Sequence, residues 1–288
     1  MGTRNPQTMR VAFQGEPGAF SEAAAIQLLG DSIITVPRRT FGSTFQAIVE
    51  GAADAVLVPV ENSLAGSIVR VYDLLVESDL TIARETILPI EHHLIGCPGA
   101  TIDDIRAVSS HPMALAQCEH FFASNPQLER IAAEDTAGSV REVLERGDKT
   151  RAAIAARRAA DYYHGAILQE GIQDDAENYT RFVLLLPAKD AKQLAVADAR
   201  KMSLALRLAH KPGSLLAALR AFASHGANLL KIESRPIHGR PWEYLFFIDL
   251  EADTPEKLDA ALEEVREASS EVRVLGRYAR YAVKPGKS

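Results

Sequence analysis

Four polar clusters in this sequence each follow a short apolar run and precede a helical pattern. They occupy residues 14–21, 61–67, 110–112 and 134–136. In parallel α/β sheets, ligands bind beyond the carboxyl ends of the strands, where helices begin. Four such clusters on the same kind of strand edge are expected to line one cleft.

Exposed backbone N–H groups at helix starts favour anions, so these clusters point to a ligand that carries a carboxylate. A purely structural reading competes with this one. In it, Gly15, Gly18 and Gly66 are turn residues, and Ser21 and Thr136 are helix caps. Each cluster alone favours the structural reading, whereas the four together favour a binding cleft.

A fifth polar group runs from Asn178 to Phe182 and leads directly into the apolar residues 183–186. Arg181 has the planar guanidinium that pairs with carboxylates, and Thr180 beside it has a hydroxyl. The alternative is a loop end with Arg181 in solvent. Spacing alone does not separate these two interpretations.

Other reactive side chains favour structural roles. His111 precedes Pro112 at a helix start, where capping or packing is the commoner role. Cys118 shares one helical stripe with Leu115 and Phe122, which predicts a buried packing residue. The adjacent His92 and His93 would point to opposite faces of a strand, so no metal site is expected.

The elements that position these groups alternate along residues 10–187. Strands are expected at 11–13, 33–36, 55–60, 107–109, 131–133 and 152–155. Helical periodicity covers 21–29, 44–50, 68–76, 113–123 and 138–146. Residues 80–97 are expected to be extended and to cross between two lobes. This alternation predicts an α/β architecture.

The remaining residues predict a second domain after a linker at 189–200. The order is strand 202–208, helix 214–224, strand 229–234, strand 244–250, helix 255–268 and strand 272–279. This β-α-β-β-α-β order is ferredoxin-like. We therefore expect a disordered N-terminus at 1–9, a first domain at 10–188 and a second at 201–283.

Bulk composition narrows the class of protein. The 288 residues favour two domains, and the net charge of −6 without a basic block argues against nucleic-acid binding. Two cysteines outside any CxxC pair fit a reducing compartment. Residues 1–10 are polar, and no apolar run reaches the ~18 residues that span a bilayer. We expect a cytoplasmic protein without membrane association.

The motifs, taken in order, resemble the prephenate dehydratase family over residues 10–187. They are Gly15-xx-Gly18-Ala19-Phe20-Ser21, Pro59-Val60-Glu61-Asn62-Ser63-xx-Gly66, Ser110-His111-Pro112-x-Ala114-Leu115-x-Gln117-Cys118 and Asn178-x-Thr180-Arg181-Phe182. Met113 departs from the family, in which many members carry glutamine. The resemblance implies two α/β lobes like a periplasmic binding protein, with the site between them.

The resemblance also implies a reaction: prephenate becomes phenylpyruvate as carbon dioxide and the ring hydroxyl leave, without a cofactor. Thr180 would assist the departing hydroxyl, with Arg181 and Glu61 as its catalytic partners. The implied substrate-binding residues are Asn62, Ser63, Ser110, Gln117, Glu134, Asn178 and Phe182. Glu61 and Glu134 have structural ion pairing as an alternative role.

The second domain resembles the regulatory ACT domain of this family over about residues 200–283, through its PGSL and NLLKIESRP motifs. Such domains pair side by side and bind an amino acid at the shared interface. The residues implied for phenylalanine are Gly213, Ser214, Leu215, Asn228, Leu229, Glu233 and Ser234. We expect feedback inhibition by phenylalanine and a homodimer or homotetramer joined through these domains.

Two other functions stay open at this stage. An arogenate dehydratase would share the motifs, since arogenate differs from prephenate in its side-chain amino group. A non-catalytic amino-acid sensor would share the fold, but it would have no need for the placed hydroxyl of Thr180.

Overall fold

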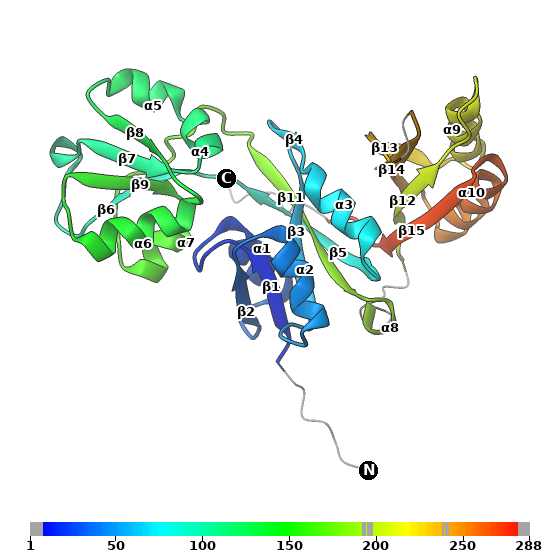
Figure 1. Cartoon of the computed structure of the whole chain (residues 1–288), viewed down its shortest axis with the longest axis horizontal. Helices are drawn as coiled ribbons and strands as arrows, with labels where there is room; N and C mark the ends of the chain where they lie inside the picture. Colours follow the sequence, from blue (N-terminus) through cyan, green and yellow to red (C-terminus); the bar gives the residue numbers. More distant parts are fainter. Residues whose placement is uncertain (1–7, 192–193, 195–197, 238, 240–241, 282–288) are drawn as a thin grey trace, which may run out of the picture. The chain divides into compact units, whose positions relative to one another are not determined.

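The computed structural model describes residues 8–191, 194, 198–237, 239 and 242–281 (Figure 1). These residues form two compact units. One comprises the chain up to Gly66 together with Thr86–Phe182, and the other comprises Ser67–Glu85 and the chain from Val183 onward. The chain therefore passes between units inside three strands: β4 (Gly66–Ser67), β5 (Leu80–Pro89) and β11 (Tyr179–Pro187).

The domain limits expected from the sequence stay a prediction, because the units follow spatial contacts rather than stretches of sequence. Most of the expected disordered terminus, residues 1–7, lies outside the described residues. So do residues 192, 193 and 195–197 of the expected linker. The part of the linker that is described includes the short helix α8 (Ala188–Ala191).

The first unit begins with a parallel arrangement in which β1 lies between β2 and β3. Its elements are β1 (Arg10–Gln14), α1 (Phe20–Leu29), β2 (Ile34–Arg38), α2 (Phe41–Val49) and β3 (Ala55–Asn62). Strands β1 and β3 are almost continuously buried, as expected for strands that helices cover. Polar groups that follow β1 and β3 thus emerge at the same edge of this sheet.

A second sheet completes the first unit, with strand order β10-β6-β9-β7-β8. Its strands are β6 (His93–Gly96), β7 (Ala107–Ser110), β8 (Glu129–Ala132), β9 (Arg151–Ala155) and β10 (Ala166–Gln169). Its helices are η1 (Ile102–Asp104), α4 (Pro112–Ala116), α5 (Glu119–Ser124), α6 (Thr136–Arg146) and α7 (Arg157–Tyr163). Strands β7, β8 and β9 are parallel, whereas β6 runs antiparallel to β9.

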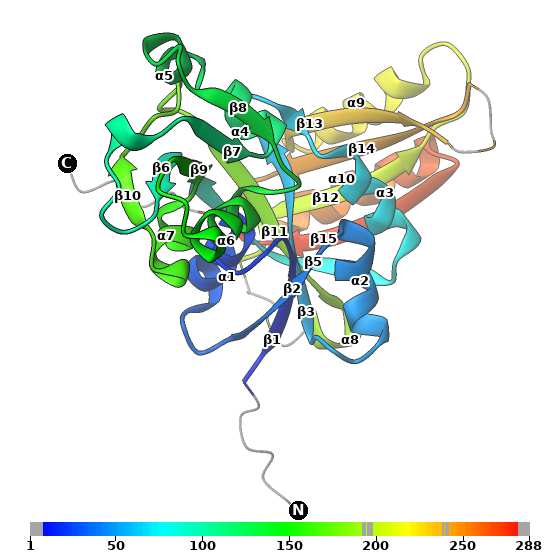
Figure 2. The same ribbon diagram turned by 60° about the vertical axis from the view of Figure 1, so that its left-hand side comes forward.

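Alternate residues of this second sheet enter two different cores. Leu94 and Ile154 pack with α4 and α5, while Ile95 and Ala153 pack with α6 and α7. A strand directs successive side chains to opposite faces, which explains this division. Figures 1 and 2 show α6 and α7 against one face of the sheet and α4 on the other. The predicted α/β class is confirmed.

Local details correct three expectations. The predicted helix over residues 113–123 is two helices, α4 and α5, separated at Gln117 and Cys118. Ser21 and Thr136 do not cap helices, because the N-cap residues of α1 and α6 are Ala19 and Asp135. Asp135 accepts a hydrogen bond from the Gly138 amide at 2.6 Å, so a carboxylate caps α6 in place of the neighbouring hydroxyl.

The turn glycine Gly18 is confirmed and has a second reason for its type. Its φ of 89° lies in the left-handed region. A Cβ at this position would stand 2.7 Å from Ala159 Cα in α7. The turn between β1 and α1 therefore packs directly against the second sheet's helix layer.

The second unit contains the expected β-α-β-β-α-β order. It consists of β12 (Lys201–Arg207), α9 (Ser214–Ser224), β13 (Asn228–Pro236), β14 (Tyr244–Glu251), α10 (Pro255–Ala268) and β15 (Glu271–Tyr278). The strand order is β13-β14-β12-β15, all neighbours antiparallel. One face buries an apolar core under α9 and α10 that includes Leu204, Phe222 and Leu258. The N-cap residue of α9 is Gly213, with a φ of 84°.

The helix α3 (Val69–Glu77) belongs to this second unit and packs on β14 through the rings of Tyr72 and Phe247, whose centroids are 4.8 Å apart. A buried ion pair adds to the unit: Lys201 Nζ donates to Glu85 Oε2 at 2.7 Å, with side chains 6% and 1% exposed. None of the helices within the described ranges has the length and apolar character that crossing a bilayer requires.

Candidate active site

Asn62, at the end of β3, is the centre of a hydrogen-bonded cluster in the first unit. Its Oδ1 accepts hydrogen bonds from the backbone amides of Leu64 at 3.1 Å and Ala65 at 2.8 Å. Because backbone N–H groups only donate, they fix the carboxamide with its oxygen toward the turn. Asn62 Nδ2 is thereby directed away from the turn as a donor.

The Nδ2 group of Asn62 joins β3 to β11. It donates to Asn178 Oδ1 at 2.7 Å, to Thr180 Oγ1 at 2.9 Å and to the Tyr179 carbonyl at 3.1 Å. Thr180 is 7% exposed, and its hydroxyl oxygen is an acceptor in this contact. In the part of the chain that the structure describes, we find no acceptor for the Thr180 hydroxyl hydrogen. The described residues therefore leave that hydrogen unused.

The hydrogen-bonded cluster continues from Asn178 to Gln117 and His92. Asn178 Nδ2 donates to Gln117 Oε1 at 3.1 Å, and the same oxygen lies 2.9 Å from His92 Nε2. Gln117 reaches this position because α4 ends there, at the break before α5. We call the three side chains of Asn62, Asn178 and Gln117 the amide relay.

Arg181 and Glu61 lie apart from Thr180 on the two strands. Successive residues of a strand point to opposite faces, so Thr180 and Arg181 diverge, as do Asn62 and Glu61. Arg181 Nη2 is 3.4 Å from Glu61 Oε2, with side chains 11% and 37% exposed. The predicted catalytic set thus divides into an amide and hydroxyl face and an ion-pair face.

Three other predicted residues have local contacts. Ser63 Oγ donates to the Glu177 carbonyl at 2.9 Å and accepts from the Tyr179 amide at 2.9 Å, which fastens the segment before Thr180. Ser110 is fully buried, and its hydroxyl donates to the Ile154 carbonyl at 2.6 Å. Phe182 is 2% exposed. Their roles in substrate binding stay predictions.

Glu134 lies elsewhere, at the end of β8. It accepts two hydrogen bonds from the Arg39 guanidinium, at 3.0 and 2.8 Å, and this contact lowers the pKa of Glu134 below its usual value. A cavity of about 420 Å³ adjoins this pair. Its lining residues are Gln14, Gly15, Glu16, Pro37, Arg38, Arg39, Glu134, Asp135 and Arg141. Glu134 is therefore placed with the turn after β1 rather than with Thr180.

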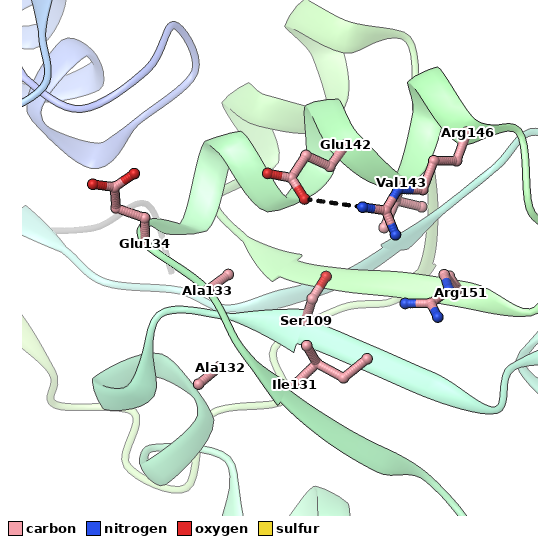
Figure 3. Close-up of a pocket in the computed structure, with 9 residues that line it drawn as sticks. All are labelled: Ser109, Ile131, Ala132, Ala133, Glu134, Glu142, Val143, Arg146 and Arg151. Carbon is pink, nitrogen blue, oxygen red and sulfur yellow. Dashed lines mark ion pairs between the residues drawn. The ribbon is translucent and has the colours of Figure 1, made fainter.

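A second cavity, of about 280 Å³, also has Glu134 at its rim (Figure 3). Figure 3 shows Ser109 and Ile131 on the sheet below α6, where Glu142 and Arg146 form an ion pair of 3.8 Å. Neither cavity has Thr180 or the amide relay in its described lining. The two cavities are therefore separate from Thr180 and the amide relay.

The cysteine and the histidine set aside from the sequence have the structural roles expected of them. Burial raises the pKa of Cys118 to about 12, so its thiol stays protonated and is no nucleophile. His111 is the N-cap of α4, and its Nδ1 accepts from the Met113 amide at 3.2 Å. Within the described ranges, no three His, Cys, Asp or Glu side chains gather as a metal site would require.

The residues expected to bind phenylalanine fall at different places in the second unit. Gly213, Ser214 and Leu215 start α9, whereas Asn228 and Leu229 follow its end. A helix of 11 residues is about 16 Å long, so the two groups are well separated in one chain. Glu233 accepts from Ser67 Oγ at 2.8 Å, and Ser234 is exposed on β13.

Comparison with known proteins decides the family. The family model described as prephenate dehydratase matches residues 11–190, which include the amide relay, Thr180 and Arg181. The chain belongs to the prephenate dehydratase family. The model described as ACT domain matches residues 202–267, over the β-α-β-β-α part of the second unit.

Relatives agree with this assignment. An arogenate dehydratase/prephenate dehydratase of Arabidopsis thaliana is 40% identical over 285 residues, covering 94% of this chain and 72% of its own. A bifunctional chorismate mutase/prephenate dehydratase of Aquifex aeolicus is 37% identical, covering 94% and 73%. The chain is thus a carbon–oxygen lyase of the prephenate or arogenate dehydratase type with a C-terminal ACT domain.

Two solved structures are similar over nearly the whole chain. A prephenate dehydratase from Arthrobacter aurescens in complex with L-Phe is 32% identical, with a TM-score of 0.83, covering 94% of this chain and 90% of its own. A structure described as a novel type of quorum quenching acylase is also 32% identical, with a TM-score of 0.83, covering 93% and 97%.

His92, which contacts the amide relay, was not singled out from the sequence. The sequence predicts His92 as an ordinary strand residue, yet β6 begins only at His93, and the His92 ring contacts Gln117 and is 2% exposed. His93 Nδ1 instead accepts from the Gly171 amide, so the two rings have different partners. No local signal in the sequence distinguishes the two histidines, because their difference arises from tertiary partners.

Proposed function

We propose that this dehydratase acts on prephenate and forms phenylpyruvate, carbon dioxide and water, and that phenylalanine inhibits it through the ACT domain. Thr180 is the residue that assists the departing ring hydroxyl. The observation that carries this assignment is the contact from Asn62 Nδ2 to Thr180 Oγ1 at 2.9 Å. A hydroxyl that accepts this bond keeps its own hydrogen for a substrate oxygen.

The proposed reaction needs orientation and one hydrogen bond. As the ring carboxylate leaves as carbon dioxide, the electron pair of the broken C–C bond enters the ring, and the hydroxyl departs from the opposite ring position. Thr180 donates a hydrogen bond to that oxygen, which strengthens as negative charge develops. The proton that completes the water comes from solvent. A preorganised donor of this kind is worth about 10²–10³ in turnover.

Arg181 and Glu61 contribute to this proposal from the strand face opposite Thr180. The Arg181 guanidinium is 3.4 Å from Glu61 and is 11% exposed. Because an arginine–carboxylate contact is strong and directional, it joins β3 to β11 and helps to fix the position of Thr180. Ser63, which fastens the segment before Thr180, and Gln117, which bonds Asn178, support the same geometry.

We further propose that phenylalanine binds between two copies of the ACT domain. In one chain, Gly213 and Asn228 stand at opposite ends of α9, so a site that uses both is assembled when two copies pair. Strand β13 is an end strand of its sheet in the described residues, which suits pairing with a second copy. The relative from Arthrobacter aurescens has L-Phe bound.

Arogenate is the second candidate substrate. Several relatives at 38–41% identity bear arogenate dehydratase in their names, and some of those names include prephenate dehydratase as well. The two substrates differ at the side chain, a keto group in one and an ammonium group in the other. Thr180 and the amide relay act on the ring rather than on the side chain, so they serve either substrate equally.

The deciding experiment supplies purified protein with prephenate or arogenate, with and without phenylalanine, and follows each product. Faster turnover of prephenate that falls when phenylalanine is added supports the proposal. Preference for arogenate overturns the substrate assignment, and turnover unchanged by phenylalanine overturns the regulation. Phenylalanine binding without turnover of either compound would favour the sensor function. Hydrolysis of an N-acyl amide serves as a further arm because of the similar acylase.

The cellular location stays a prediction. The sequence favours the cytoplasm, and the names of several plant relatives include the word chloroplastic. Fractionation of the source cells, followed by detection of the protein in each fraction, measures this directly.

A further inference from the structure

We propose that His92 is a positioning residue of the dehydration: it holds Gln117, and through the amide relay it fixes the direction of the Thr180 hydroxyl. The inference rests on the function proposed above and adds a residue to its site. His92 does not touch Thr180. Four successive contacts connect them: His92 to Gln117, Gln117 to Asn178, Asn178 to Asn62 and Asn62 to Thr180.

The direction of every hydrogen bond in this chain follows from its first member. The Leu64 and Ala65 amides hold Asn62 Oδ1, so Asn62 Nδ2 donates. Asn178 Oδ1 must then accept, which makes Asn178 Nδ2 a donor to Gln117 Oε1. No carboxamide in the relay can turn over without placing two acceptors or two donors against each other.

The same logic determines the protonation of His92. Gln117 Oε1 is an acceptor, so the ring nitrogen 2.9 Å away, His92 Nε2, carries a hydrogen and donates it. His92 Nδ1 is buried, and the described residues offer it no hydrogen-bond partner. The ring is therefore the Nε2–H tautomer. In this tautomer, Nδ1 has no hydrogen, so the group that is buried without a partner is an acceptor rather than a donor.

Several contacts hold the His92 ring in place. The His92 amide donates to Gln173 Oε1 at 2.9 Å, and the His92 carbonyl accepts from the Ile172 amide at 2.9 Å. Phe20, in the first turn of α1, meets the imidazole edge-on, with ring centroids 5.6 Å apart at 82°. Burial lowers the pKa of His92, which keeps the ring neutral. The relay consequently ends on a fixed group.

The Thr180 hydroxyl keeps a fixed direction when the relay ends on a fixed group such as the His92 ring. Without His92, Gln117 Oε1 keeps one donor, Asn178 Nδ2, and the glutamine side chain regains rotamer freedom. Asn178 then loses its restraint on one side, and the Asn62–Thr180 geometry loosens. The expected effect falls on turnover more than on substrate affinity, because the contact that suffers is one made to the departing oxygen.

His93 provides a matched control in the same chain. It is 3% exposed and adjacent in sequence, but its Nδ1 accepts from the Gly171 amide near β10, and its Nε2 lies 4.0 Å from Glu91 Oε2. Burial also lowers its pKa. Replacement of either histidine removes a buried imidazole, but only His92 is connected to the relay.

The kinetic test compares His92→Gln, His92→Leu and His93→Leu, with unfolding transitions measured for each. A glutamine side chain can present an N–H donor where imidazole Nε2 stood, so kcat is expected within about threefold of the parent. His92→Leu is expected to lower kcat about tenfold, the worth of one neutral hydrogen bond, with KM little changed. Equal losses in His92→Leu and His93→Leu would overturn the proposal.

A second comparison separates positioning from a general structural role. In the Thr180→Val background there is no hydroxyl to position, so adding His92→Leu is expected to leave kcat unchanged. If His92 only supports the fold, the second substitution lowers kcat by the same factor in both backgrounds. Additive losses therefore exclude the proposed connection.

The arrangement itself is measured without any turnover, by ¹⁵N NMR of the imidazole nitrogens in the full-length protein. The Nε2–H tautomer of His92 is expected, and its loss of the Gln117 contact in Gln117→Leu should shift the Nε2 resonance. An Nδ1–H tautomer overturns the inference even in an active enzyme. If neither prephenate nor arogenate reacts while the Nε2–H tautomer is found, the proposed function has failed and the relay stands.

Discussion

Asn62 and Thr180 are joined by a hydrogen bond of 2.9 Å in which the amide donates and the hydroxyl accepts. Asn62 is the last residue of β3, and Thr180 is the second residue of β11. The direction of the bond matters because threonine has one hydrogen to give. The amide uses the oxygen's acceptor capacity and leaves that hydrogen to the ligand.

Thr180→Val is expected to keep the fold and to lower kcat by about 10²–10³, the usual cost of one preorganised donor. Valine has nearly the shape of threonine, so packing at this 7%-exposed position is retained. Steady-state kinetics with both candidate substrates measure the loss. Thr44→Val is the control, since Thr44 is fully buried and its hydroxyl bonds only to the Thr40 carbonyl in the described residues. Comparable activity losses in both variants would contradict the role of Thr180.

Asn62→Asp is expected to lower kcat about as much as Thr180→Val does. The new carboxylate only accepts, so the Thr180 hydroxyl turns to donate to it, and its hydrogen is withdrawn from the substrate. The carboxylate also faces Asn178 Oδ1, which lies 2.7 Å from the present amide. Because Asn62→Asp and Thr180→Val each remove the same donor, the Thr180 hydroxyl, the double variant should lose little more activity than either single variant. Multiplicative losses would show that the two residues act independently.

Sequence periodicity located the elements around this site but not the position of Gln117. Residues 113–123 have one continuous apolar stripe and predict one helix. In the structure, helix α4 ends at Ala116, with Gln117 as its C-cap, and helix α5 begins at Glu119. The reason is Asp174, whose carboxylate accepts from the Glu119 and His120 amides at 2.8 and 2.9 Å. A cap supplied from 55 residues away leaves no local pattern. His92 was missed for the same reason.

Other features were accessible from the sequence because they depend on short-range chemistry. Helices α9 and α10 begin and end at the predicted residues, with a glycine before one and Pro255 in the first turn of the other. The divergence of Thr180 and Arg181 also follows from strand alternation, once residues 179–182 are taken as part of the strand. Which residues meet across strands, such as Asn62 and Thr180, depends on tertiary register, and the sequence pattern does not encode it.

Lys201→Met is expected to destabilise the second unit by about 3–5 kcal/mol, because it removes the ammonium group that pairs with the buried Glu85 carboxylate. The two side chains are 6% and 1% exposed, so solvent cannot replace the lost partner. Urea unfolding measures the change. The double variant Lys201→Met/Glu85→Gln should recover part of the loss, since a neutral amide can still accept from the Tyr281 amide, which lies 3.0 Å from Glu85 Oε1. A single variant as stable as the parent would contradict this account of the pair.

The stability of the protein is expected to fall as the pH is lowered below about 6.5, the usual pKa of histidine. Burial lowers the pKa of His92 in the folded state, with the neighbouring His93 adding to the effect, so the unfolded chain binds its proton first. Protons therefore favour unfolding between the unfolded and the folded pKa, and the loss is complete below the folded value. Urea unfolding from pH 7.5 to 5 measures it in the parent and in His92→Gln.

The glutamine variant does not titrate at this position, so its stability should depend less steeply on pH, with the difference from the parent confined to the region below about 6.5. His93 is retained in both proteins, and its own lowered pKa contributes equally to the two curves. Parallel curves would mean that His92 is protonated in the fold as readily as in the unfolded chain. The ring would then carry a charge beside Gln117, and the relay would end on a cation rather than on a neutral donor.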